Sequence, residues 1–291
     1  MATEYYYFVT GLPAQSADDT KLLLTPLMFL HAAEEHLDES DFDLLELLLM
    51  PNDITNLVHI LHDKDQWSDE NTVSREEWEE VLALLKEHVD SNPLNKKLFK
   101  KHIPPFMIDY LHEYVKSGEL KAENVLYQEL FSRFYDWIKT SNNDFIKEWF
   151  RFDSDIRNIT IAINCRKHGI SYHDQLIGNN DLTEKLIKST AGDFGLGGEY
   201  PMFETISRLN DQPDIIEKEK GFDALRWKWI DNRTFFDYFT IPRILGYFLK
   251  LQIVYRWIHL SQSVGEKRFN QVLHDLETSF EFPEEFALNK R

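Results

Sequence analysis

Histidine and carboxylate side chains are the residues of this chain that could most directly bind a metal ion. His31, Glu34, Glu35 and His36 lie within six positions, and His31 and Glu35 share a helix face at i, i+4 spacing. A di-iron site in a helical bundle needs paired Glu-x-x-His sequences, and a zinc peptidase needs His-Glu-x-x-His. Neither arrangement is present, so we predict exposed histidines on a helix face and no metal site.

Other motifs of catalytic type lack the context that their chemistry requires. Asp193-Phe194-Gly195 spells the magnesium motif of kinases, but the glycine-rich loop, strand lysine and catalytic loop of a kinase are missing. The glycines from Gly195 to Gly198 follow no strand, so a flexible connector is favoured over a phosphate cradle. Cys165 stands beside three basic residues that could lower its pKa, although a buried helix cysteine is favoured. We therefore expect no catalytic residue and no cofactor.

Net charge narrows the classes of partner. The chain carries 32 basic and 50 acidic residues, a net charge of −18, and residues 63–90 alone hold ten acids and three bases. Such a surface repels phosphate backbones and anionic lipid, which argues against nucleic-acid binding. The acidity either confers solubility or forms a rim that faces a basic protein partner.

A repeated polar pattern is the second group of candidate residues. Asp53-Ile54-Thr55-Asn56-Leu57 and Asp155-Ile156-Arg157-Asn158-Ile159 share the pattern Asp-Ile-x-Asn-apolar, and a weaker copy begins at Gln252. In each of the first two copies Asp and Asn lie three residues apart, on one helix face. Buried side chains of this kind must find hydrogen-bond partners, so they would fix helix packing; exposed ones would contact a partner or solvent.

The elements that hold these residues are helical throughout. Eleven glycines and ten prolines leave long tracts with apolar residues at helical spacing, which favours an all-α fold. Predicted helices cover 25–36, 40–51, 52–62, 74–85, 105–118, 121–140, 143–168, several segments after 214, and 265–279. Pro51 is expected to end one helix before the first repeat helix starts. Residues 4–9 are rich in β-prone side chains and fit a short strand or an extended arm.

The last third of the chain resembles a known family. Glu219-Lys220-Gly221-Phe222-Asp223 resembles the E-R/K-x-L/F-D signature of the C-type subunit (d-type in eukaryotes) of V-type and archaeal-type rotary ATPases. The segment 244–253, with Tyr247, Lys250 and Gln252, resembles that family's apolar-Tyr-x-x-K/R-x-E-I helix, although Gln252 replaces the glutamate. The middle repeat, ending in Arg166, resembles its D-x-x-N-L helix with a basic end.

Two further segments resemble a narrower family. Tyr5 to Pro13 and Trp227 to Phe236 are similar to DUF2764, a bacterial family of unknown function encoded beside V-type ATPase genes. This resemblance extends over nearly the whole chain.

The resemblance to the C-type ATPase subunit implies an all-helical, funnel-shaped, non-catalytic protein. It would consist of three similar units, at about 14–110, 111–200 and 201–291. Such a protein is a socket of the central stalk between the rotor shaft and the membrane ring, and couples them for ion transport. Its partners would be the shaft subunits and the membrane ring, and it would neither bind nucleic acid nor insert into the membrane. It would lie in the cytoplasm, peripheral to the inner membrane through the ATPase complex. An assembly factor or regulator with the same fold, or a metal-binding helical enzyme, are the alternatives.

The residues assigned to packing or to an interface are those of the repeats and of the resembling motifs. They are Asp53, Asn56, Asp155, Arg157, Asn158, Arg166, Glu219, Asp223, Tyr247, Lys250 and Gln252.

Overall fold

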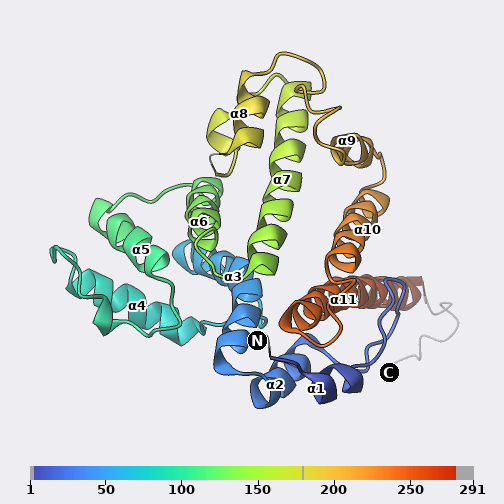
Figure 1. The fold of residues 1–291 in the computed structure, drawn as a ribbon, viewed down its shortest axis with the longest axis horizontal. Coiled ribbons are helices and arrows are strands. Elements are labelled where there is room, and N and C mark those ends of the chain that lie inside the picture. The colour runs from blue at the N-terminus through green and yellow to red at the C-terminus, as the bar shows by residue number, and fades with distance from the viewer. Residues whose placement is uncertain (1–2, 179, 280–291) are drawn as a thin grey trace, which may run out of the picture.

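The structure is a computed structural model that describes residues 3–178 and 180–279, with side chains described up to residue 261 (Figure 1). In this part of the chain there are eleven α-helices and no β-strand, which confirms the predicted all-α class. The helices are α1 (Tyr6–Gly11), α2 (Pro26–His36), α3 (Glu39–Leu61), α4 (Arg75–Glu87), α5 (Pro105–Ser117), α6 (Glu123–Ile138), α7 (Asp144–Lys167), α8 (Asp181–Lys188), α9 (Phe203–Asn210), α10 (Ile215–Arg233) and α11 (Ile241–Ser279).

Several helix ends lie where local sequence signals place them. The hydroxyl of Thr25 accepts a hydrogen bond from the amide of Met28, and Pro26 occupies the first position of α2. Ser74 and Glu77 form the predicted capping box of α4. Gly118 adopts a left-handed conformation with φ of 63° and ends α5, as a residue without Cβ does readily.

The prediction that Pro51 ends a helix is wrong. α3 runs without interruption from Glu39 to Leu61, with Pro51 inside it. An interior proline removes one backbone hydrogen bond and costs about 3 kcal/mol. The loss is offset because α3 buries apolar side chains on both sides of the proline, including Leu49 and Ile54. Burial of the whole helix therefore outweighs the local breaking signal.

The prediction of a strand or extended arm at residues 4–9 is also wrong, because residues 6–11 form α1. The preceding residue is fixed by tertiary contacts: the Tyr5 amide donates to the carbonyl of Phe239 at 2.7 Å, and the Tyr5 hydroxyl donates to Asp41. The described residues offer no sheet with which a strand could pair. The β-prone composition of residues 4–9 therefore does not produce a strand, because β propensity reflects how side chains pack in a sheet.

A third difference concerns the end of the chain. The predicted separate helix at 265–279 is the continuation of α11, which spans 39 residues from Ile241. Gly246 lies where α11 crosses α10, and a Cβ at this position would lie 2.8 Å from the Cγ2 of Ile230. The absence of a side chain at Gly246 thus lets the two helices approach closely.

Five helices contact one another in a closed circuit that positions the candidate site. α3 packs on α7, α7 on α9, α9 on α10, α10 on α11, and α11 on α3. In Figure 1, α7 and α10 are two upright limbs, and α11 crosses beneath them. Helices α4, α5 and α6 extend this circuit outward from α3, and α8 packs on α7. A stack of Phe152 on Trp229, with ring centroids 5.2 Å apart, joins the upright limbs.

One described helix is long and apolar enough to cross a membrane by length and composition. It is α3, and half of its most apolar window is buried inside the protein. Core helices of soluble proteins and membrane spans both pass this test, so it is weak support for a membrane span.

Candidate functional site

A cavity of about 710 Å³ lies inside the circuit of helices. Its wall is formed by residues of α3, α7, α10 and α11, and of the loop before α4. Charged side chains of both signs line it, namely Glu70, Asp153, Asp223, Arg226 and Arg256. These residues come from parts of the chain that lie far apart in sequence, so only the tertiary structure brings them together.

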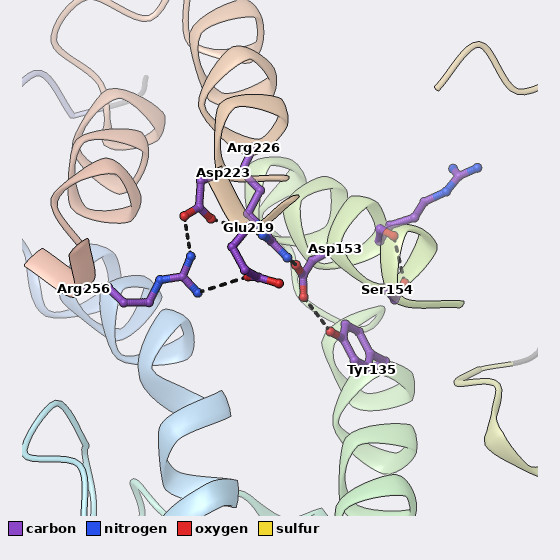
Figure 2. A network of polar contacts seen from close by, with 8 residues as sticks. Tyr135, Asp153, Ser154, Glu219, Asp223, Arg226 and Arg256 are labelled. Carbon is purple, nitrogen blue, oxygen red and sulfur yellow. Dashed lines mark hydrogen bonds and ion pairs between the residues drawn. The ribbon is translucent and has the colours of Figure 1, made fainter. Parts of the chain in front are cut away.

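A network of ion pairs crosses the cavity wall, and Asp223 is its centre (Figure 2). The carboxylate of Asp223 is 5% exposed and accepts hydrogen bonds from Arg226, Arg256 and the indole nitrogen of Trp257, the last at 2.7 Å. Glu219, one turn earlier on α10, lies 4.0 Å from Arg256. A single carboxylate thus connects α10 to α11 through two guanidinium groups.

The same network reaches α6 and α7 through Arg226. Its guanidinium group donates to Asp153 of α7 at 3.2 Å, and Asp153 accepts a hydrogen bond from the hydroxyl of Tyr135 at 3.1 Å (Figure 2). Burial alone would lower the pKa of Arg226, but the carboxylates of Asp153 and Asp223 raise it. Arg226 therefore remains a cation, and four helices share one charge-paired cluster.

The sequence patterns identified part of this network and missed the rest. The motif at 219–223 identifies Glu219 and Asp223, but no sequence motif includes Asp153 or Arg226. Residues 219, 223 and 226 follow i, i+4, i+7 spacing, so one face of α10 carries all three charges. That spacing was a readable signal for Arg226. Asp153 had no such signal, because its partner lies 73 residues away.

The two full copies of the repeat each hold a loop by the same pair of hydrogen bonds. Asn56 accepts from the amide of Ser68 at 2.8 Å and donates to its carbonyl at 2.9 Å. Asn158 makes the same two bonds with Ile177, at 2.8 and 2.9 Å. Both asparagines are fully buried. An amide side chain is suited to this role, because it offers one donor and one acceptor in one plane.

The aspartates of the two copies differ in their partners. Asp53 accepts three hydrogen bonds, from the amide and hydroxyl of Thr72 and from the amide of Val73. Asp155 accepts one, from the Tyr200 hydroxyl at 3.0 Å, and its other oxygen has no partner among the described residues. Burial raises the pKa of Asp155.

The third copy has different surroundings. Gln252 donates to the carboxylate of Glu70 at 3.2 Å, across the cavity, and Tyr255 stands where the other copies have asparagine. Burial raises the pKa of Glu70. Among the described residues, no asparagine of this copy holds a loop. The pair of side-chain hydrogen bonds, which we call an asparagine clamp, is therefore shared by the first two copies.

The remaining predicted residues contact other parts of the protein. The guanidinium of Arg157 lies 4.9 Å from the ring centroid of Phe131, and Arg166 donates to the carbonyls of Ser189 and Ala191. The Tyr247 hydroxyl donates to the carbonyl of Pro13, and burial raises the pKa of Tyr247 to about 12. Lys250 pairs with Asp231. None of these four lines the cavity of the charged network.

The histidines and carboxylates of residues 31–36 are not gathered into a metal site. His31 and Glu35 lie on an exposed face of α2, 3.7 Å apart. Within the described residues no group of three or more His, Cys, Asp or Glu side chains could hold a metal ion. Cys165 is buried, with its sulfur 3.7 Å from the Gln175 side chain.

A pH experiment tests the burial of Asp53. Burial raises its folded-state pKa from 3.8 to about 6, despite three hydrogen bonds that lower it. The folded state then holds this proton more tightly than the unfolded state, so the stabilisation is complete below pH 3.8 and is lost as pH rises through 6. Relative to Asp53→Asn, the wild type should lose about 2 kcal/mol of unfolding free energy between about pH 4.5 and 7.5.

Urea unfolding of both proteins across this range measures the difference. Asp65→Asn, at an exposed carboxylate of the following loop, is the matched control and should track the wild type. A wild-type curve parallel to that of Asp53→Asn would show that Asp53 has the same proton affinity in the folded and unfolded states.

These contacts define the class of the protein: an all-helical protein with a circuit of helices around a charge-lined cavity and two asparagine-clamped loops. The chain belongs to the family described as "Protein of unknown function (DUF2764)", whose family model matches residues 1–280. The predicted resemblance to this family is therefore confirmed. No curated protein and no solved structure matches the chain.

Proposed function

We propose that this protein is a non-catalytic component of the central stalk of a bacterial V-type or A-type rotary ATPase, a socket that couples the rotor shaft to the membrane ring for ion transport. The observation that carries the proposal is the charge-lined cavity inside the circuit of α3, α7, α9, α10 and α11. Its wall includes Asp223, Gln252 and Arg256, which lie in or beside the segments that resemble the C-type ATPase family.

The funnel of three helical units is part of this proposal. The asparagine clamps support two equivalent units, one around Asn56 and one around Asn158. The third unit would be α10 and α11, in which the charged network replaces the clamp. Because α5 spans the expected boundary at residue 110, we place the first boundary at the turn of Gly118.

Rigidity is the physical property that such a coupling element needs. Closely packed helices resist deformation, and the circuit is cross-linked where packing alone is weakest, at the open cavity. The network around Asp223 joins α6, α7, α10 and α11 across that opening. The acidic surface would orient the socket toward basic loops of its partners and raise the rate of association.

Purification of the intact ATPase from native membranes tests the proposal. The protein should appear as a band stoichiometric with the shaft subunits, held at the cytoplasmic side of the inner membrane. Its absence from the pure complex, together with its presence during assembly, would replace the socket by an assembly factor. Stoichiometric iron, manganese or zinc in the purified protein would argue for a metal-binding enzyme instead.

A further inference from the structure

The turn between α10 and α11, together with α1, exposes a patch of aromatic side chains, which we call the aromatic patch (Tyr6, Tyr7, Phe235, Phe236 and Tyr238). Phe236 is 81% exposed and Tyr7 92%. The two parts of the patch are joined, because the rings of Tyr6 and Phe239 lie 4.3 Å apart. Exposed aromatic side chains on two segments that contact each other are a common sign of a surface that a partner covers.

The segment of α10 and α11 that includes the turn differs in charge from the whole protein, whereas the α1 side of the aromatic patch holds carboxylates, with Glu4 bonded to Tyr6 and Asp41 to Tyr5. Residues 222–261 hold six basic and three acidic residues, whereas the chain has a net charge of −18. Asp231 pairs with Lys250, and Asp237 pairs with Arg233. Among the described residues, no carboxylate lies within ion-pair distance of Lys228 or Arg243. Both are exposed, Lys228 on α10 and Arg243 at the start of α11, so each of the two helices that meet at the turn carries a cation without a carboxylate partner among the described residues.

Residues 280–291 of the same molecule are excluded as the occupant of the patch. α11 carries the chain away from the turn over 39 residues, which is about 57 Å at 1.5 Å per residue. The twelve residues from 280 to 291 span at most about 42 Å when fully extended. They are therefore too few to return to Phe235.

Charge argues against a second copy of the chain and against an anionic lipid surface as the occupant of the aromatic patch. A second copy would bring its own charge of −18 and would set the same unpaired cations against each other. An anionic lipid surface would repel the protein as a whole, and carboxylates are present beside the aromatic side chains, with Glu4 next to Tyr6. An apolar centre with charges of both signs at its rim is the usual anatomy of a protein interface.

We propose that the aromatic patch docks a protein surface that is apolar at its centre and carries carboxylates opposite Lys228 and Arg243. This inference rests on the proposed function, under which that surface belongs to the membrane rotor ring. The turn of the patch begins after Arg233, where α10 ends, ten positions and about 15 Å along the helix from Asp223. The cavity is thereby left for the shaft, so the two partners have separate sites.

Binding of the full-length chain to two purified partners tests the inference. Phe235→Ser/Phe236→Ser should bind the solubilised membrane ring roughly 100-fold more weakly than the wild type, because buried aromatic anchors dominate interface energies. Binding to the shaft subunits should be unchanged. Lys228→Gln/Arg243→Gln should mainly slow association with the ring, and the rate should depend less on salt.

Controls separate docking from folding and from lipid binding. Leu120→Ser removes an apolar side chain that is 75% exposed in the α5–α6 loop, and it should bind both partners as the wild type does. Thermal unfolding of the double phenylalanine variant should overlay that of the wild type, because both side chains are exposed.

The outcomes are distinguishable. Wild-type affinity of the double phenylalanine variant for the ring would overturn the inference and leave the proposed function standing. Phenylalanine-dependent binding to protein-free vesicles of phosphatidylcholine and phosphatidylglycerol would also overturn it, in favour of a lipid surface. Failure of the wild type to bind either ring or shaft would remove the proposed function and the inference together.

Discussion

Asp223→Ala is expected to lower the free energy of unfolding by about 3–5 kcal/mol. The carboxylate is 5% exposed and accepts from Arg226, Arg256 and Trp257. Its removal leaves Arg226 with Asp153 alone and Arg256 with the more distant Glu219. The cost arises because half-buried cations lose a partner. The free energy of leaving such a cation unpaired is larger than the net free energy gained when the pair forms.

Chemical unfolding followed by circular dichroism measures this loss. Asp136→Ala is the matched control, because its carboxylate and the ammonium group of its partner Lys139 are both half exposed, and it should cost less than about 1 kcal/mol. The double variant Asp223→Ala/Arg256→Ala should lose less than the sum of its two single variants, since they share one interaction. A loss at Asp223 no larger than that at Asp136 would mean that water already screens the network.

Asn158→Ala is expected to lower the free energy of unfolding by about 2–5 kcal/mol. The substitution leaves the amide and the carbonyl of Ile177 without partners, and both hydrogen bonds are buried. Each unsatisfied buried group costs about 1–3 kcal/mol, because it gives up water without gaining a replacement. The loop before α8 should also become more susceptible to proteolysis near Ile177, since both hydrogen bonds of Asn158 join that part of the loop to α7.

Asn56→Ala provides the comparison within the same molecule. It removes the same pair of bonds, but those to Ser68 are only partly buried, so water can replace them. We expect a loss of about 1–2 kcal/mol for Asn56→Ala, clearly below that of Asn158→Ala. Equal losses at both positions would indicate that burial does not distinguish the two clamps. Chemical unfolding of the three proteins under one condition decides between these results.

The two clamps also show how far a sequence pattern reaches. The spacing of Asp53 and Asn56, and of Asp155 and Asn158, identified polar residues that require partners if buried. The spacing does not identify Ser68 or Ile177, the residues that the asparagines hold, because those lie 12 and 19 positions away, in loops beyond the ends of α3 and α7. The third copy satisfied the apolar spacing equally well, yet its Gln252 faces the cavity.

The helical class, and the helix ends that depend on near neighbours, follow from the order of residues alone. Thr25 with Met28, Ser74 with Glu77, and Gly118 act within four residues, so their hydrogen bonds and backbone preferences form wherever the segment lies. Long-range packing instead sets the continuity of α3 through its interior proline, where burial along the helix outweighs one lost bond. It also sets the helical form of residues 6–11.

Asp223 and Arg226 form an i, i+3 pair within α10, but the contacts that join the charged network across helices exist only in the folded arrangement. Asp153 and Arg226 are 73 residues apart, and Asp223 and Arg256 are 33 apart. Their pairing depends on the circuit of helices closing, and that closure is set by the summed packing of many apolar side chains. Local preferences act over a single turn of helix, whereas a cavity wall forms only when distant helices meet.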